Sequence, residues 1–188
     1  MKKVILFFII SIFSFAVEKE AYFAGGCFWC MEPPFEKLAG VLSVTSGYSG
    51  GHIENPSYKE VSSGKTGHRE AVKITYEDSV VTYPQLLETF WKQIDPTDPD
   101  GQFVDRGFQY SSAIFYIDEK QKSQALKSLE DLENSKKFEK KIVTDIVKFK
   151  NFYPAEEYHQ DYYKKNKLRY KYYRYHSGRD QFLNSIWK

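Results

Sequence analysis

The two cysteines of this 188-residue chain, Cys27 and Cys30, lie three positions apart and directly after a pair of glycines. An apolar run at 21–24 precedes the glycines, so we predict a strand, a glycine turn and a helix whose first turn carries both thiols. Residues three apart on a helix are close enough for a disulfide, and a helix N-terminus favours thiolate over thiol. We expect Cys27 to be the exposed, reactive thiol and Cys30 to attack whatever forms on it.

Other interpretations of this C-x-x-C motif must be weighed. Zinc binding is not favoured, because the chain has no second C-x-x-C and its four histidines lack paired ligand spacing. An inert structural disulfide would close a loop too short to restrain much chain. A thioredoxin-type redox pair is the serious competitor. The residue pattern therefore favours redox or nucleophilic chemistry and leaves the reaction open.

Glu70 is the candidate acid for such a reaction. Alternation with period two places it on the same strand face as Val72, Ile74 and Tyr76, which is the core face. A carboxyl group at the end of an apolar face is a candidate for a raised pKa and for proton donation. A solvated glutamate at a strand start is an equally good interpretation of the pattern alone.

The elements that must position these groups alternate between strands and helices. This alternation predicts an α/β (α+β) fold, with one mixed sheet and flanking helices in a single domain. Residues 47–58 are rich in turn formers and predict a long loop, which is typical of a functional site. We expect strands at 21–24, 41–45, 71–76, 112–117 and 142–147, and helices at 83–91, 119–134 and 155–162.

The C-terminal stretch from about residue 164 forms a Tyr-rich, basic extension. Residues 164–188 carry eight Lys or Arg and one acid, with four interleaved tyrosines. Basic and aromatic residues together can bind nucleic acid. We instead expect a solvated wrap over the domain, in which Ser177 and Asp180 form a capping box for a last short helix.

The first 16 residues have the pattern of a signal peptide. Lys2 and Lys3 precede an apolar run, and Ala16 closes a small-residue cleavage site. The run is short for a membrane span, so an uncleaved anchor is the weaker alternative. Cleavage lowers the formal charge from +2 to 0, because it removes two lysines and no acid, and nothing in that balance points to nucleic acid. We expect residues 17–188 to be an exported, periplasmic monomer with no membrane span.

The chain resembles the A class of peptide methionine sulfoxide reductases from about residue 22 to residue 163. Several motifs in the same order make the likeness specific: GCFW at 26–29, GYSGG at 47–51, NPSY at 55–58, GHREAV at 67–72, QYSSAI at 109–114 and AEEYHQ at 155–160. The resemblance implies a mixed α/β roll related to the ferredoxin-like arrangement. It also implies reduction of the S epimer of methionine sulfoxide in oxidised proteins.

The resemblance assigns roles residue by residue. Cys27 matches the nucleophile, and Glu70 matches the acid that protonates the sulfoxide oxygen. Sulfoxide reduction itself requires a thiol with an acid beside it, because a sulfoxide sulfur becomes electrophilic only when its oxygen is protonated or strongly hydrogen-bonded. The remaining matches are the hydrogen-bonding residues Tyr58, Tyr110 and Asp105 and the methyl-pocket residues Phe28 and Trp29.

In the implied cycle, attack on the sulfoxide leaves a sulfenic acid on Cys27, which Cys30 converts to a disulfide. A thioredoxin-like dithiol then reduces the pair, and no cofactor is needed. Many members recycle through cysteines in a C-terminal tail, whereas this tail has none, so the resolving thiol must be Cys30. The alternative is a general exported thiol-disulfide oxidoreductase, which would need neither Glu70 nor the Tyr58 loop.

Overall fold

A curled six-stranded sheet organises the fold in the computed structural model, which describes residues 17–187. Strands β6 and β7 are parallel and every other neighbouring pair is antiparallel, so the sheet is mixed, as predicted. Its spatial order is β7 (Asp145–Lys148), β6 (Ala113–Tyr116), β1 (Glu18–Ala24), β3 (Arg69–Glu77), β2 (Val41–Ser49) and β8 (Phe152–Pro154). A separate two-stranded ribbon joins β4 (Gly101–Gln102) to β5 (Asp105–Arg106).

Alternation along the central strands separates two cores on the two faces of this sheet. On one face, Phe23, Val72 and Ile74 pack against the helices in the main hydrophobic cluster. On the other face, the Tyr22 ring stacks on Phe149 with a centroid distance of 4.2 Å. The sheet is therefore buried on both sides, which fixes the register of β1 against β3.

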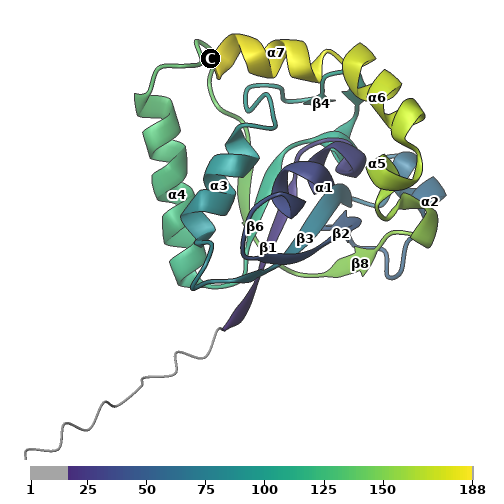
Figure 1. Ribbon diagram of the computed structural model, residues 1–188, viewed down its shortest axis with the longest axis horizontal. Helices are drawn as coiled ribbons and strands as arrows, with labels where there is room; N and C mark the ends of the chain where they lie inside the picture. Colours follow the sequence, from purple (N-terminus) through teal and green to yellow (C-terminus); the bar gives the residue numbers. More distant parts are fainter. Residues whose placement is uncertain (1–16, 188) are drawn as a thin grey trace, which may run out of the picture.

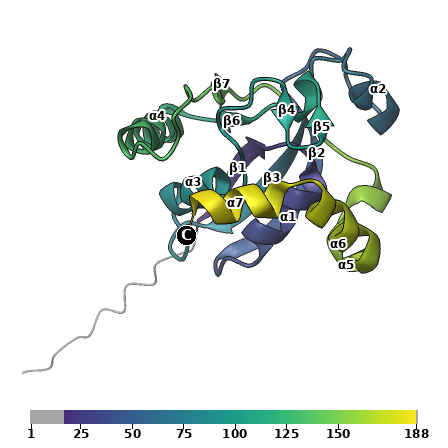
Figure 2. The ribbon, with the colours of Figure 1, turned by 90° about the horizontal axis from the view of Figure 1, so that it is seen from above.

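Helices and short 3₁₀ turns surround the sheet (Figure 1). Helices α3 and α4 have the predicted bounds, and α1 is continuous through Pro33 and Pro34. Figure 2 shows α1, α3 and α7 together on one side of the sheet. None of the helices within 17–187 is long and apolar enough to cross a membrane. The helices are α1 (Phe28–Glu36), α2 (Tyr58–Ser62), α3 (Tyr83–Trp91), α4 (Glu119–Asn134), α5 (Tyr162–Lys165), α6 (Lys167–His176) and α7 (Arg179–Ile186), with 3₁₀ turns at Phe108–Tyr110 and Glu157–His159.

Strand β2 is longer than the sequence predicts. It continues through the GYS stretch to Ser49, where a loop is expected, because these residues pair with β3 on one side and β8 on the other. Gly47 allows this close packing, since a Cβ there would lie 2.4 Å from the Tyr153 carbonyl oxygen. The predicted strand at 142–147 begins later, at Asp145, where the backbone joins β6.

The helix predicted at 155–162 is wrong. The segment holds only the 3₁₀ turn Glu157–His159 before α5 begins. The Gln160 side chain bonds both the N–H and the carbonyl of Ser46, and the Glu156 carboxylate accepts from Tyr48 and from the Tyr58 backbone. These side-chain bonds hold the segment against β2 and α2 in an extended conformation, so it does not form a helix.

Candidate active site

The glycine turn between β1 and α1 presents both thiols, as the sequence predicts. Cys27 is the N-cap residue of α1, and its carbonyl accepts a hydrogen bond from the Cys30 N–H at 3.0 Å. Gly26 has a φ of +80°, and a Cβ there would lie 2.6 Å from Gln102 and 2.8 Å from the Arg179 guanidinium. Only glycine fits this position, because the backbone is left-handed and closely packed.

Both thiols are buried, which corrects the expectation of an exposed Cys27. Cys27 is 6% exposed and Cys30 is 0% exposed. Burial, the hydrogen bond to Cys30 and the carboxyl groups of Glu70 and Asp105 raise the pKa of Cys27, so the helix N-terminus does not make it the resting thiolate. The hydrogen bond with Cys27 lowers the pKa of Cys30 to about 7, assisted by the guanidinium groups of Arg179 and Arg174.

A cavity of about 140 Å³ opens beside Cys27 and collects residues from distant parts of the chain. Seven of its eight lining residues are those that the sequence analysis assigns to the site. Cys30 is absent from this wall, because it lies behind Cys27 in the first turn of α1. The lining residues are Cys27, Phe28, Trp29, Tyr58, Glu70, Asp105, Tyr110 and Tyr173.

Glu70 reaches the cavity from β3 and is 2% exposed. The backbone N–H of Phe28 donates to its Oε2 at 3.0 Å, which fixes the carboxyl group beside the Cys27 turn. Burial raises the pKa of Glu70 to about 8, and the nearby Asp105 carboxyl group adds to this shift. Glu70 is therefore protonated at neutral pH and can donate a proton into the cavity.

Two tyrosines and Asp105 complete the polar side of the cavity. Tyr58 begins α2, whose capping box joins Ser57 and Glu60, and Tyr110 ends the 3₁₀ turn Phe108–Tyr110. Burial raises the pKa of Tyr58 to about 12 and also raises the pKa of Tyr110, so both phenols keep their protons at neutral pH. The two hydroxyl groups are thus available to bond a polar oxygen inside the cavity.

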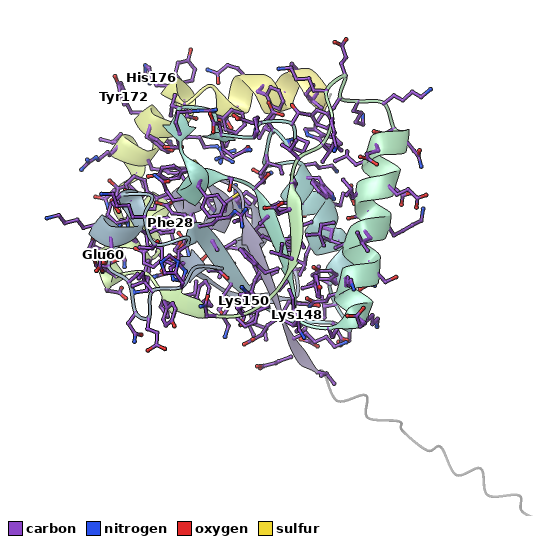
Figure 3. All side chains as sticks on the ribbon, turned by 180° about the vertical axis from the view of Figure 1, so that it is seen from behind. Phe28, Glu60, Lys148, Lys150, Tyr172 and His176 are labelled. Carbon is purple, nitrogen blue, oxygen red and sulfur yellow. The ribbon has the colours of Figure 1, made fainter. Side chains whose placement is uncertain are left out.

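The aromatic side of the cavity is held in place by a histidine. Trp29 donates its indole N–H to His159 Nδ1 at 3.1 Å and stacks on Tyr162 with a centroid distance of 3.7 Å. The His159 ring also lies 4.9 Å from the Phe28 ring and 4.4 Å from the Tyr58 ring. His159 is buried without lining the cavity, so it positions the wall and does not face the reacting atoms. Figure 3 shows Phe28 lying inside the molecule, whereas Glu60 lies at its edge.

The C-terminal helices are part of the site, which corrects the expectation of a solvated wrap. Tyr173 on α6 lines the cavity, and its hydroxyl donates a short hydrogen bond to Asp105. Arg179 at the start of α7 is 1% exposed. No local spacing pattern signals these residues, because they reach the site only through long-range packing. The clue in the sequence is the dense run of tyrosines and arginines itself.

The predicted capping box of the last helix is also wrong. Gly178 is the N-cap residue of α7 and makes no side-chain cap. Ser177 ends α6, where its hydroxyl donates to the Arg174 carbonyl, and Asp180 accepts a hydrogen bond from Arg174 Nε at 2.8 Å. Asp180 is thus used to hold Arg174, which lies against the cysteine turn.

The part of the chain that the structure describes contains no cluster of side chains that could hold a metal ion. Within 17–187, no three His, Cys, Asp or Glu side chains gather as a metal site. The side chains that line the cavity offer the Cys27 thiol, the carboxyl groups of Glu70 and Asp105, and the phenols of Tyr58, Tyr110 and Tyr173.

Comparison with known proteins places this cavity in a family. The family model described as peptide methionine sulfoxide reductase matches residues 19–188, which includes the C-terminal extension outside the resemblance given above. The chain is 55% identical over 170 residues to the peptide methionine sulfoxide reductase MsrA of Listeria monocytogenes serotype 4a, covering 90% of this chain and 96% of that protein. It is 54% identical to the MsrA/MsrB protein of Vibrio cholerae serotype O1, of which it spans 44%.

Solved structures agree with the sequence comparison. Reduced Mxr1 from Saccharomyces cerevisiae superposes with a TM-score of 0.75 at 33% identity, covering 80% of this chain and 86% of that one. A structure of Mxr1 in complex with Trx2 matches with a TM-score of 0.55 at 24% identity, covering 77% of this chain and 84% of that one. The mixed α/β roll expected from the sequence is confirmed.

Proposed function

The chain belongs to the A class of the peptide methionine sulfoxide reductase family, and we propose that it reduces methionine S-sulfoxide in oxidised proteins in the cavity beside Cys27. The observation that carries this proposal is the composition of that cavity. It holds a thiol, a carboxyl group with its pKa raised to about 8, two neutral phenols and an aromatic wall within about 140 Å³. Each of these groups can perform one function that sulfoxide reduction requires.

In the first step, the sulfoxide oxygen accepts bonds from Tyr58 and Tyr110 while its methyl group lies against Phe28 and Trp29. The Cys27 sulfur attacks the sulfoxide sulfur, and Glu70 gives its proton to the oxygen. The oxygen then passes from the methionine sulfur to the Cys27 sulfur, the bond between the two sulfurs breaks, and methionine leaves Cys27 as a sulfenic acid. The buried site suits this step, because the apolar wall excludes the water that would compete for the oxygen.

Cys27 must lose a proton as it attacks, and the acceptor is already in place. Cys30 is its hydrogen-bonded neighbour and has the lower pKa of the two thiols. The proton therefore passes from Cys27 to Cys30 while the new bond to sulfur forms. Cys27 can therefore react although its raised pKa keeps it protonated in the resting enzyme.

Cys30 next resolves the sulfenic acid. Its sulfur bonds to the Cys27 sulfur, the S–O bond breaks, and the oxygen leaves as water with the proton that Cys30 carried. An external dithiol of the thioredoxin type reduces the disulfide, and its proton restores Glu70. No prosthetic group enters the cycle, because the dithiol supplies both electrons.

The polar groups of the cavity argue against a general thiol-disulfide oxidoreductase. Such an enzyme exchanges sulfur–sulfur bonds and needs no carboxyl group held in its protonated form beside the thiol. Glu70 lines the cavity together with Cys27, and burial raises its pKa to about 8. Turnover with a thioredoxin system should therefore be seen with methionine S-sulfoxide and not with insulin. Rapid insulin reduction that survives Glu70→Gln would overturn the proposal.

Export to the periplasm belongs to the same proposal. Residues 1–16 lie outside the described residues, and the domain begins directly after them, with β1 at Glu18 and the family match at residue 19. The mature protein is then a monomer starting at Val17. Mass spectrometry of the periplasmic fraction and light scattering of the purified protein test both statements. A full-length membrane-bound product would contradict export, and a dimer would contradict the monomer.

A further inference from the structure

Two arginines of the C-terminal segment bracket the turn that carries the thiols. Arg179 Nη2 donates to the Gly25 carbonyl at 3.0 Å, and Arg174 Nη1 donates to the Cys30 carbonyl at 3.2 Å. The two bonds therefore fall at the two ends of the stretch from Gly25 to Cys30. Figure 2 shows α6 and α7, which carry these arginines, on the same side of the sheet as α1.

Arg179 is a buried charge without a carboxylate partner. Its guanidinium bonds the Gln93 carbonyl at 2.5 Å as well as Gly25, and lies 4.7 Å from the centre of the Phe103 ring. Arg174 differs, because Asp180 pairs with it. Within residues 17–187, no salt bridge forms at Arg179. A buried cation is costly unless a negative group lies near it, so its surroundings should hold one.

Cys30 is the group best placed to carry that negative charge. It is 0% exposed, and the positive charges of Arg179 and Arg174 both favour its ionised form. Asp105 on β5 is the other acid near Arg179, but Tyr173 already bonds its carboxylate.

Among the described residues, the remaining ionisable groups around Cys30 supply no cation besides Arg179 and Arg174. Cys27 on α1 donates a hydrogen bond, while Glu70 on β3 and Asp105 on β5 oppose a negative charge. Tyr170 and Tyr173 on α6 are neutral, because burial raises the pKa of both phenols. The hydrogen bond with Cys27 is the largest cause of the lowered pKa of Cys30, and the two arginines are the cations that add to it.

We propose that Arg179, assisted by Arg174, is a positioning residue that holds Cys30 as a thiolate and aligns it on Cys27. The inference rests on the proposed function and deepens it, because the same sulfur serves twice. As a thiolate, Cys30 first accepts the proton of Cys27. Its sulfur then forms the S–S bond as the S–O bond of the sulfenic acid breaks, and the accepted proton leaves with the oxygen as water. The C-terminal segment, which has no cysteine here, thus still takes part in recycling.

The direct test is the ionisation of Cys30 in a Cys27→Ser background, followed by thiolate absorbance at 240 nm. This readout needs no reagent to reach the buried sulfur. Arg179→Gln should raise the pKa of Cys30 by at least about one unit, which at pH 7 means a roughly tenfold smaller thiolate fraction. Arg179→Lys should restore most of the shift. Arg169→Gln is the matched control, because it removes one exposed charge from α6 away from Cys30.

The same substitutions in the enzyme with both cysteines test the reaction. Arg179→Gln should slow disulfide formation after a single turnover by about tenfold at pH 7, with a sulfenic acid that dimedone traps. If Arg179→Gln does not fold by near-ultraviolet circular dichroism, Arg174→Gln should show a smaller change in the same direction. Unchanged titration and unchanged disulfide formation in the folded variants overturn the inference.

The experiments distinguish a failure of the proposed function from a failure of the role of Arg179. If the unsubstituted enzyme releases methionine but keeps Cys30 as a free thiol, the resolving role of Cys30 is wrong whatever Arg179 does. If the disulfide forms normally with Arg179→Gln, only the role of Arg179 is wrong.

Discussion

The Phe28 backbone N–H donates to Glu70 Oε2 at 3.0 Å, so the acid on β3 is tied to the residue that follows the nucleophile on α1. The bond spans 42 positions of sequence and fixes the carboxyl group beside the reacting sulfur. It also leaves the proton of Glu70 free for the cavity, because a backbone N–H can only donate. The acid is thus held beside the nucleophile by a bond to the backbone of the same turn.

Glu70→Gln should lower the rate of methionine release at pH 7 by about 10²- to 10³-fold, because the amide cannot transfer a proton to the sulfoxide oxygen. Single-turnover reactions quenched at successive times measure this rate directly. The Gln side chain can still accept the Phe28 bond, so the fold should be kept.

The pH profile of the unsubstituted enzyme provides a second measure of the same group. Glu70 is protonated below its pKa of about 8, so methionine release should fall as the pH rises through about 8. The Glu70→Gln variant should lack this descending limb. A limb of the same shape in the variant would assign the ionisation to another group.

Cys30→Ser should complete one turnover and then stop. We expect about one equivalent of methionine and a sulfenic acid on Cys27 that dimedone traps, because no second thiol lies within reach. Continuous turnover with a thioredoxin system measures recycling. Full recycling in this variant would remove Cys30 from the cycle.

Tyr173→Phe should lower kcat/KM for the sulfoxide by about tenfold, because it removes the hydroxyl that bonds the Asp105 carboxylate in the cavity. Tyr172→Phe is the matched control on the same helix, since Tyr172 is 67% exposed and stacks on His176 at the surface (Figure 3). Equal effects of the two substitutions would show that Tyr173 has no role in the cavity.

Glu32 should make the stability of the protein depend on pH. It is 1% exposed, and burial raises its pKa to about 7 from 4.5. The folded protein therefore holds this proton up to about pH 7, whereas the unfolded chain releases it near pH 4.5. The free energy of unfolding should fall across that window as the pH rises.

Glu32→Gln should reduce this fall, because the amide does not ionise. Urea unfolding at pH 5 and pH 8 measures the change in both proteins. Exposed Glu130 on α4 offers the control, since Glu130→Gln should leave the pH dependence unchanged. An identical fall in the Glu32→Gln protein would contradict the assignment.

Local signals were sufficient for part of this molecule. The strand, turn and helix around Cys27, the core face of β3 and the bounds of α3 and α4 follow from glycine placement, periodicity and proline position. All of these features depend on residues close to one another along the chain. The residue pattern alone indicates Cys27 and Glu70 of the cavity, and the resemblance to the family assigns the other five predicted lining residues.

Long-range contacts decide the rest. The 155–162 segment has helical composition, yet the side chains of Glu156 and Gln160 bond residues of β2 and α2 about 100 positions away. The burial of Cys27 and the approach of Tyr173, Arg174 and Arg179 likewise depend on where α6 and α7 pack. Periodicity carries no information about such contacts, so it predicts only a solvated wrap for the tail.

The most direct test of the central claim is single-turnover reduction of the two separated epimers of an N-blocked methionine sulfoxide by the reduced enzyme without added reductant. We expect about one equivalent of methionine from the S epimer alone, with loss of both free thiols. No product from either epimer, with both thiols still titratable, would contradict it.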